Sequence, residues 1–229
     1  MTYATTPERG KVLQSHLLQQ VMGIEHFSSL KESTHAERDV YLPRQVHGTH
    51  IIIKEEDTSV DTEADAVICQ TNGQWIGVRT ADCVPVLMAA PQSGMVAAIH
   101  AGWRGTVKHI VRLTIERMKE LGCKPEEMYA MVGPSISADV YEVGPEVVEA
   151  FSKAGRAECV VHRQAAQGEK TFVDLWQSNV MDMLDCDIPL QNIDCTPLCT
   201  YTDNDVLYSA RREGIGTGRN ITAIRLMTT

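Results

Sequence analysis

Apolar runs bounded by turn residues follow one another through the middle of the chain and predict a series of β-strands. The residues of these runs are largely β-branched or alternate with polar residues, and both patterns are typical of strands. A turn sequence, Pro-Gln-Ser-Gly at 91–94, separates two of the runs and predicts a hairpin. The predicted strands are 50–56, 65–70, 75–80, 84–90, 95–100 and 221–227. Residues 1–40 are the least patterned part, and segment 11–30 suits either a strand or a helix.

Helical spacing of apolar residues predicts three helices in the second half of the chain. The clearest begins at Thr106, a suitable N-cap, and stops at Gly122. Its apolar face consists of Val107, Ile110, Val111, Ile115, Met118 and Leu121. Two further helices are predicted from Pro145 through Phe151 and over residues 174–184. Because strands outnumber helices and one pair forms a hairpin, the pattern predicts an α/β (α+β) fold with mixed β-sheets.

Composition and charge narrow the class of protein. The 229 residues are 43% hydrophobic and 22% charged, as in globular proteins, and we expect a single domain over 1–229. Acidic residues number 30 against 21 basic ones, and the net charge of −9 argues against binding nucleic acid or an anionic membrane. No apolar run approaches the roughly 18 residues of a membrane span, and the polar N-terminus does not resemble a signal peptide. With seven cysteines, an odd number, we expect reduced thiols and a cytoplasmic location.

The predicted hairpin brings a cysteine and a histidine together. If the turn centres on residues 92–93, Cys83 faces Gly102 and His100 faces Pro85. The side chains of Cys83 and His100 then leave the same face of the sheet as diagonal neighbours, roughly 7–8 Å apart at Cα. A thiolate and an imidazole at that spacing can share one metal ion or one proton.

Two flanking segments extend this candidate site. The sequence Ala-Gly-Trp-Arg-Gly-Thr (101–106) leads from the strand into the predicted helix, where free backbone N–H groups and Arg104 suit a phosphate or carboxylate. Upstream, His47 starts a predicted strand, and with Cys83 and His100 it would offer a metal two nitrogens and one sulfur. Three protein ligands with a fourth position open are typical of catalytic zinc. Sequence spacing alone does not bring His47 to the other two residues.

Six ordered blocks of the sequence closely resemble the laccase-domain family, over about residues 40–229. Proteins of this family were first named multicopper polyphenol oxidases and are now described as purine nucleoside phosphorylases. The blocks are PRQVHG (43–48), RTADCVPVLM (79–88), AIHAGWRGT (98–106), VGPSIS…YEVG (132–144), FVDLW…N (172–179) and YSARREGIGTGR (208–219). The sequence departs from the family pattern at 23–42, which is shorter and lacks the family's glycines, and at Asp139-Val140, where a cysteine is common.

The resemblance implies a zinc enzyme whose metal ligands are His47, Cys83 and His100. It implies phosphorolysis of adenosine, inosine and methylthioadenosine to the free base and ribose 1-phosphate or its methylthio analogue. It also implies deamination of adenosine to inosine. The implied fold is a single α/β domain with mixed sheets sandwiched by helices, distantly shared with the cytotoxic necrotizing factor toxins, which use a Cys–His pair. The expected partners are therefore a purine nucleoside and phosphate, with a monomeric or homodimeric protein.

Further residues receive expected roles on this basis. Asp82, beside Cys83, is the candidate acid or base for proton transfer during deamination. Phosphate is expected at Gly105 and Thr106, near Arg104. Arg44 and Gln45 are expected to bind substrate, and Arg211, Arg212 and Arg219 are further candidates for binding an anion.

Two other functions remain open at this point. Cys83 as a thiolate nucleophile with His100 as its base would make a metal-independent amidase or deamidase, for example on a cell-wall precursor. A non-catalytic nucleoside-binding module is the other. A true multicopper oxidase is disfavoured, because a coupled copper cluster takes histidines on the order of ten and the chain has eight.

Overall fold

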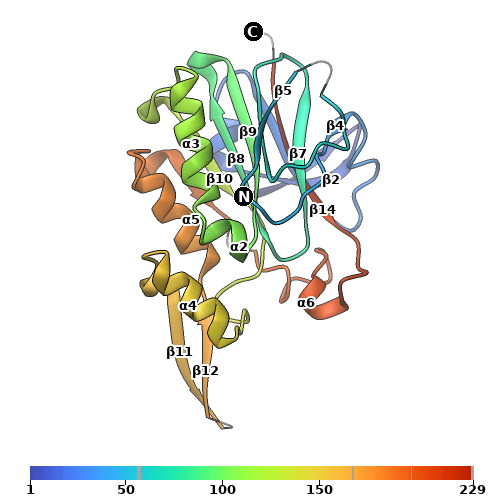
Figure 1. The fold of residues 1–229 in the computed structure, drawn as a ribbon. Helices are drawn as coiled ribbons and strands as arrows, with labels where there is room; N and C mark the ends of the chain where they lie inside the picture. Colours follow the sequence, from blue (N-terminus) through green and yellow to red (C-terminus); the bar gives the residue numbers. More distant parts are fainter. Residues whose placement is uncertain (56–57, 167, 197, 228–229) are drawn as a thin grey trace.

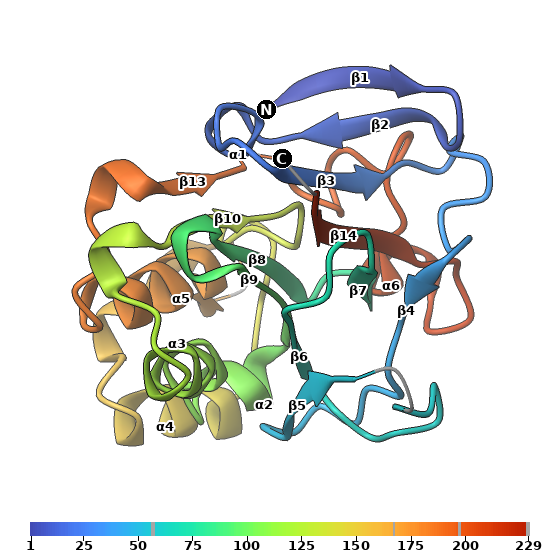
Figure 2. The same cartoon turned by 90° about the horizontal axis from the view of Figure 1, so that it is seen from above.

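Two six-stranded mixed sheets pack face to face in the computed structural model, which describes residues 1–55, 58–166, 168–196 and 198–227 (Figures 1 and 2). The first sheet has the order β1 (Thr2–Thr6), β2 (Gly10–Gln14), β3 (Ile24–Ser29), β14 (Asn220–Leu226), β7 (Trp75–Thr80) and β4 (Val40–Tyr41). The second has the order β13 (Ile193–Cys195), β10 (Tyr129–Val132), β8 (Val84–Ala90), β9 (Met95–Ala101), β6 (Ala66–Cys69) and β5 (Ile51–Lys54). A separate ribbon pairs β11 (Val160–Ala165) with β12 (Gly168–Val173) and projects away from the sheets (Figure 1).

Alternation along the central hairpin divides the core into two layers. Leu87 and Val96 face the first sheet, whereas Met88 and Ala97 face the helices. Every residue of β8 and β9 is buried, which explains why both segments are continuous apolar runs in the sequence.

Two of the longer helices, α3 (Ile110–Glu120) and α5 (Leu175–Leu184), pack on the outer face of the second sheet, and the third, α4 (Pro145–Lys153), lies at the base of the β11–β12 ribbon (Figure 1). The shorter helices are α1 (His16–Gln19), α2 (Trp103–Thr106) and α6 (Ala210–Glu213). The described residues also form four single-turn 3₁₀ helices, at Pro91–Ser93, Pro125–Glu127, Ala157–Cys159 and Leu190–Asn192. The predicted mixed α/β class is confirmed, with both parallel and antiparallel pairs in each large sheet. Among the described residues, no helix combines the length and the apolar character that crossing a membrane requires.

The predicted helix from Thr106 to Gly122 is wrong at its beginning. The chain turns into α2 directly after Gly102, and it is interrupted at His109, whose φ of 58° lies in the left-handed region. The helix then restarts as α3 and ends at Glu120, and Gly122 has a φ of +101°, as a stop residue should. The apolar spacing continues through the break, so the pattern alone could not reveal it.

The N-terminal 40 residues contain more structure than their pattern predicts. They supply β1, β2 and β3 of the first sheet, with the short α1 before β3. β1 alternates between half-buried and exposed residues, so its apolar signal is weak. The strand predicted over 50–56 is β5, and Glu56 lies outside the described residues.

Candidate metal centre

The hairpin register places Cys83 and His100 as predicted. Val84 pairs with Ala101 and Pro85 with His100, so the predicted register of the β8–β9 pair is confirmed. Cys83 is the residue before β8, and His100 is the penultimate residue of β9. Both side chains therefore lie at the same end of the hairpin and on the same face.

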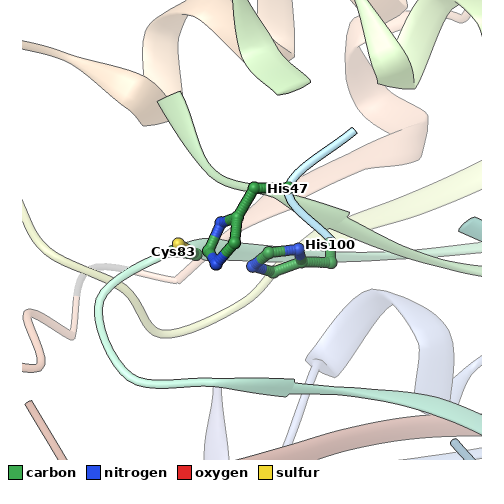
Figure 3. Close-up of side chains that lie close together, drawn as sticks. All are labelled: His47, Cys83 and His100. Carbon is green, nitrogen blue, oxygen red and sulfur yellow. The ribbon is translucent and has the colours of Figure 1, made fainter. Parts of the chain in front are cut away.

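A buried carboxylate brings His47 to this pair. His47 lies in the loop between β4 and β5, with a left-handed φ of 56°. Asp65 is fully buried directly before β6, and its carboxylate accepts hydrogen bonds from the backbone N–H groups of Val46 (3.3 Å), His47 (3.0 Å) and Gly48 (2.7 Å). These three hydrogen bonds wrap the loop around one carboxylate and turn the imidazole of His47 toward the hairpin (Figure 3).

The three side chains converge on one point. One ligand atom from each of His47, Cys83 and His100 lies within 4.8 Å of the others, and the two imidazole centroids are 4.8 Å apart (Figure 3). Asp65 binds Nδ1 of His100 at 2.7 Å, which leaves Nε2 of that ring for a ligand. A Cβ on Gly102 would lie 2.9 Å from Sγ of Cys83 and 3.2 Å from Nδ1 of His47, so only glycine leaves the space that this cluster occupies.

The electrostatics favour a charged pair. Burial would raise the pKa of Cys83, but the imidazoles of His100 and His47 outweigh it and lower that pKa to about 6. Burial would lower the pKa of His100, but hydrogen bonds to Asp65 and Cys83 raise it to about 9. In the absence of a metal, a thiolate therefore faces an imidazolium near neutral pH. One ionised thiol and two imidazoles form a donor set that can hold a metal ion.

The cluster opens into a cavity of about 530 Å³, a size typical of small-molecule sites. It is lined by Pro43, Arg44, Gln45, His47, Arg79, Thr80, Ala81, Cys83, His100, Ala210, Ile215 and Arg219. Arg44 forms an ion pair with Glu63 at 2.6 Å, and Arg79 forms one with Glu37 at 3.0 Å. The cavity thus joins the cluster of His47, Cys83 and His100 to two arginines, each of which is paired with a glutamate.

The family assignment follows from a match that spans nearly the whole chain. Residues 21–227 match the model of a family described as multi-copper polyphenol oxidoreductase laccase. The chain belongs to this family. The family residues quoted from the sequence, His47, Cys83 and His100, are the ones that the fold brings together.

Relatives of this laccase-family protein carry two kinds of name. A protein of Bacteroides thetaiotaomicron named purine nucleoside phosphorylase is 36% identical over 98% of this chain and 85% of its own length. A protein from an unknown prokaryotic organism named adenosine deaminase RL5 is 38% identical over 81% of this chain and 74% of its own. The crystal structure of Bacillus licheniformis hypothetical protein YfiH superposes with a TM-score of 0.83 at 18% identity, covering 98% of each chain, and so shows the same fold.

Asp82 precedes Cys83 of the laccase-family cluster but is not among the residues that line the cavity. Its carboxylate accepts hydrogen bonds from the hydroxyls of Thr200 (2.6 Å) and Ser209 (2.7 Å) and from the backbone N–H of Arg211 (2.6 Å). Its φ of 95° is unusual for a residue with a side chain. These contacts hold the turn that carries Cys83 against the segment before α6.

The expected phosphate residues are not brought to the cavity. α2 begins at Trp103, so Gly105 and Thr106 stand at its end rather than at a helix start, and both are buried. The Thr106 hydroxyl donates to the carbonyl of Ala101 (3.4 Å) and accepts from the Asn179 amide (3.3 Å). The guanidinium of Arg104 stacks over Trp103 at 4.4 Å.

The other candidate residues divide by position. Arg44 and Gln45 line the cavity, although the Gln45 amide brackets the backbone of Arg79 with two 2.8 Å hydrogen bonds. Arg211 and Arg212 stack over tyrosine rings and donate to backbone carbonyls outside the cavity lining. Asp65 was missed by the sequence reasoning, and its only signal is an acidic residue at the head of an otherwise apolar run.

Proposed function

We propose that this protein is a zinc-dependent purine nucleoside phosphorylase that also deaminates adenosine. Its substrates would be adenosine, inosine and methylthioadenosine, which phosphate would cleave to the base and ribose 1-phosphate or its methylthio analogue. The observation that carries the proposal is the convergence of His47, Cys83 and His100 in the wall of a cavity large enough for a nucleoside. The names of the relatives that share the fold support the choice of reaction.

His47, Cys83 and His100 would hold the zinc ion, whose donor preferences they meet with two nitrogens and one sulfur. Bound there, zinc would supply Lewis acidity toward water and substrate. Asp65 fixes the imidazole of His100 through Nδ1 and the loop of His47 through three backbone N–H groups. Both histidines are thus oriented before any ligand arrives.

The remaining roles follow from the contacts of the side chains. Because three donors already bind the Asp82 carboxylate, its role in this proposal is to position Cys83, in place of the proton transfer expected from sequence. Phosphate is assigned to the wall formed by Arg44 and Arg79 instead of Gly105 and Thr106. The carboxylate partners of both arginines are exposed, and such surface pairs contribute only about 0–1 kcal/mol, so phosphate can replace them.

The deciding experiment incubates the purified protein with adenosine, with and without phosphate, and separates the products by chromatography. Adenine that forms only with phosphate demonstrates phosphorolysis, and inosine in either case demonstrates deamination. Metal analysis of the same sample should find about one zinc per chain, and His47→Ala should lose both zinc and activity. A protein that forms neither product contradicts the proposal.

A metal-independent amidase is the second candidate, and the lowered pKa of Cys83 is the observation that favours it. With His100 beside it as an acid–base partner, the thiolate could attack an amide carbonyl. Full activity on an amide after chelation and removal of zinc would support this reading. Loss of all activity on chelation would favour the nucleoside phosphorylase.

A further inference from the structure

One strongly exposed apolar side chain stands at the cavity that holds the metal-binding cluster. Ile215 is 88% exposed. In the described parts of the chain, the other exposed large hydrophobic residues are Tyr3, Met22, Val46, Val60, Leu113, Leu184 and Leu190, and none of them lines this cavity. Burying an isoleucine side chain is favourable, so at a ligand cavity Ile215 offers apolar surface that a bound ligand can cover.

The loop that presents Ile215 is held rigidly by its own residues. Arg219 donates from Nη2 to the carbonyl of Ile215 (3.0 Å) and from Nη1 to the carbonyls of Thr217 (2.5 Å) and Gly218 (3.0 Å). The hydroxyl of Thr217 donates to the Glu213 carboxylate at 2.8 Å. The guanidinium of Arg219 therefore holds the loop closed through its hydrogen bonds, and Ile215 lies at the tip of the loop.

The base of the loop is anchored to the first sheet. A Cβ on Gly218 would lie 2.5 Å from the ring of Tyr208, so the loop backbone rests directly on that ring. Tyr208 in turn exchanges two hydrogen bonds with the Asn220 side chain, at 3.0 and 2.9 Å, where β14 begins. A preorganised loop can bind a ligand without the entropic cost of ordering itself.

We propose that Ile215 packs against one face of the purine ring and is the apolar specificity contact of the site. The inference rests on the proposed nucleoside phosphorylase function. Ribose and phosphate carry hydroxyls or charge, whereas the face of the base is the apolar part of a nucleoside. The same cavity is also lined by Arg44, Gln45 and Arg79, whose polar side chains suit the ribose and the phosphate. Gly214 and Gly216 flank Ile215, so no neighbouring side chain competes for the contact.

The test measures binding of inosine to the zinc-loaded protein in phosphate-free buffer by calorimetry. Ile215→Ala should raise the Kd about tenfold, as losses of apolar contact in pockets do, and Ile215→Val should have a smaller effect. Leu190→Ala, which truncates an exposed apolar residue outside the cavity, is the matched control and should leave the Kd unchanged. The midpoint of thermal unfolding should be unchanged in all three variants, because the substituted side chains are exposed.

Product inhibition of phosphorolysis then identifies the part of the nucleoside that Ile215 contacts. Ile215→Ala should weaken inhibition by hypoxanthine about tenfold and leave inhibition by ribose 1-phosphate unchanged. An unchanged Kd for inosine, or weakened inhibition by ribose 1-phosphate alone, would overturn the inference while leaving the phosphorylase function intact. A wild-type protein that neither binds inosine nor cleaves it would overturn both.

Discussion

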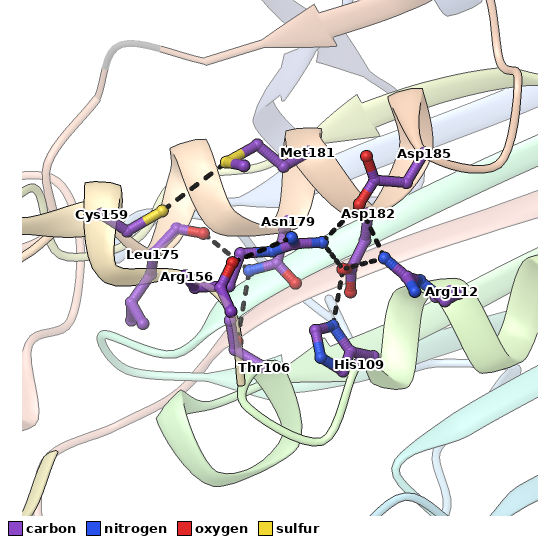
Figure 4. A network of polar contacts seen from close by, with 11 residues as sticks. Thr106, His109, Arg112, Arg156, Cys159, Leu175, Asn179, Met181, Asp182 and Asp185 are labelled. Carbon is purple, nitrogen blue, oxygen red and sulfur yellow. Dashed lines mark hydrogen bonds and ion pairs between the residues drawn. The ribbon is translucent and has the colours of Figure 1, made fainter. Parts of the chain in front are cut away.

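Two histidine–aspartate pairs flank α2, and they have the same local geometry but different surroundings. His100 binds Asp65 at 2.7 Å beside the cavity, and His109 binds Asp182 at 2.8 Å between α3 and α5. Around the first pair, the other ring nitrogen of the histidine is left for the cluster with Cys83. Around the second, the aspartate also binds the Arg156 guanidinium at 2.6 Å (Figure 4).

What each pair can do depends on the other groups that bind its aspartate. Asp65 has backbone N–H groups and one imidazole as partners. Its negative charge therefore stabilises the imidazolium of His100, which faces the thiolate of Cys83. Asp182 is balanced by a guanidinium that is almost fully buried, so its charge is already compensated. The same two residue types therefore belong to the proposed reactive site in one place and to a structural ion-pair network in the other.

The sharpest test of this contrast removes each histidine in turn. His100→Ala removes a proposed metal ligand, and loss of several kcal/mol of transition-state stabilisation should lower kcat/KM at least about a thousandfold. His109→Ala should leave kcat/KM within a few fold. Steady-state phosphorolysis of inosine measures both, and equal losses in the two variants would contradict the contrast.

The second test concerns stability. Asp182→Ala leaves the buried Arg156 with only the half-exposed carboxylate of Asp185, at 2.7 Å. Removing one partner of a buried ion pair costs about 3–5 kcal/mol, and chemical denaturation should show a loss of that size in the free energy of unfolding. Zinc content should stay at its wild-type value at 25 °C. A variant of normal stability that has lost zinc would place this pair in the metal centre.

How much of this contrast the sequence predicts depends on the range of the interactions. The Cys83–His100 meeting is local to one hairpin, so strand alternation and a tight turn suffice to predict it. The approach of His47 depends on Asp65, which follows it by 18 residues and acts through backbone hydrogen bonds that leave no pattern in the sequence. The family resemblance supplied His47, but only the structure shows how it is held.

The one error in the predicted helices has a related cause. The helix start at Thr106 was wrong because the apolar spacing of α3 continues backward through the break at His109, where the ring of His109 binds Asp182. Asp182 lies on α5, far along the chain, so the residues near His109 in the sequence give no sign of this contact. The proton transfer expected of Asp82 is not tested by the structure, which adds only that the three donors bound to its carboxylate come from residues 200–211.

The third test removes the charge of Asp65 and keeps all three proposed metal ligands. Asp65→Asn loses the negative charge behind His100, and changes of this kind behind a ligating histidine typically lower metal affinity about 10–100-fold. Competition with a zinc chelator of known affinity measures the change. Asp182→Asn is the matched control and should bind zinc as the wild type does. Equal zinc affinity in Asp65→Asn and wild type would contradict the role given to Asp65.

The smallest expected effect is a shift in the titration of Cys83, measured in chelator-treated protein as the pH dependence of its alkylation and located by peptide mapping. The pKa of Cys83 is lowered to about 6, so alkylation should rise as the pH increases through about 6 and then level off, well below the range of an ordinary thiol. Asp65→Asn should move this midpoint upward, because the pKa of His100 is raised in part by its hydrogen bond to Asp65 and an imidazolium less firmly held stabilises the thiolate less. Asp182→Asn should leave the midpoint in place, since its charge is balanced by Arg156. A midpoint that moves equally in both variants would mean that both aspartates affect the pKa of Cys83. That result would contradict the distinction between the proposed reactive pair and the structural pair.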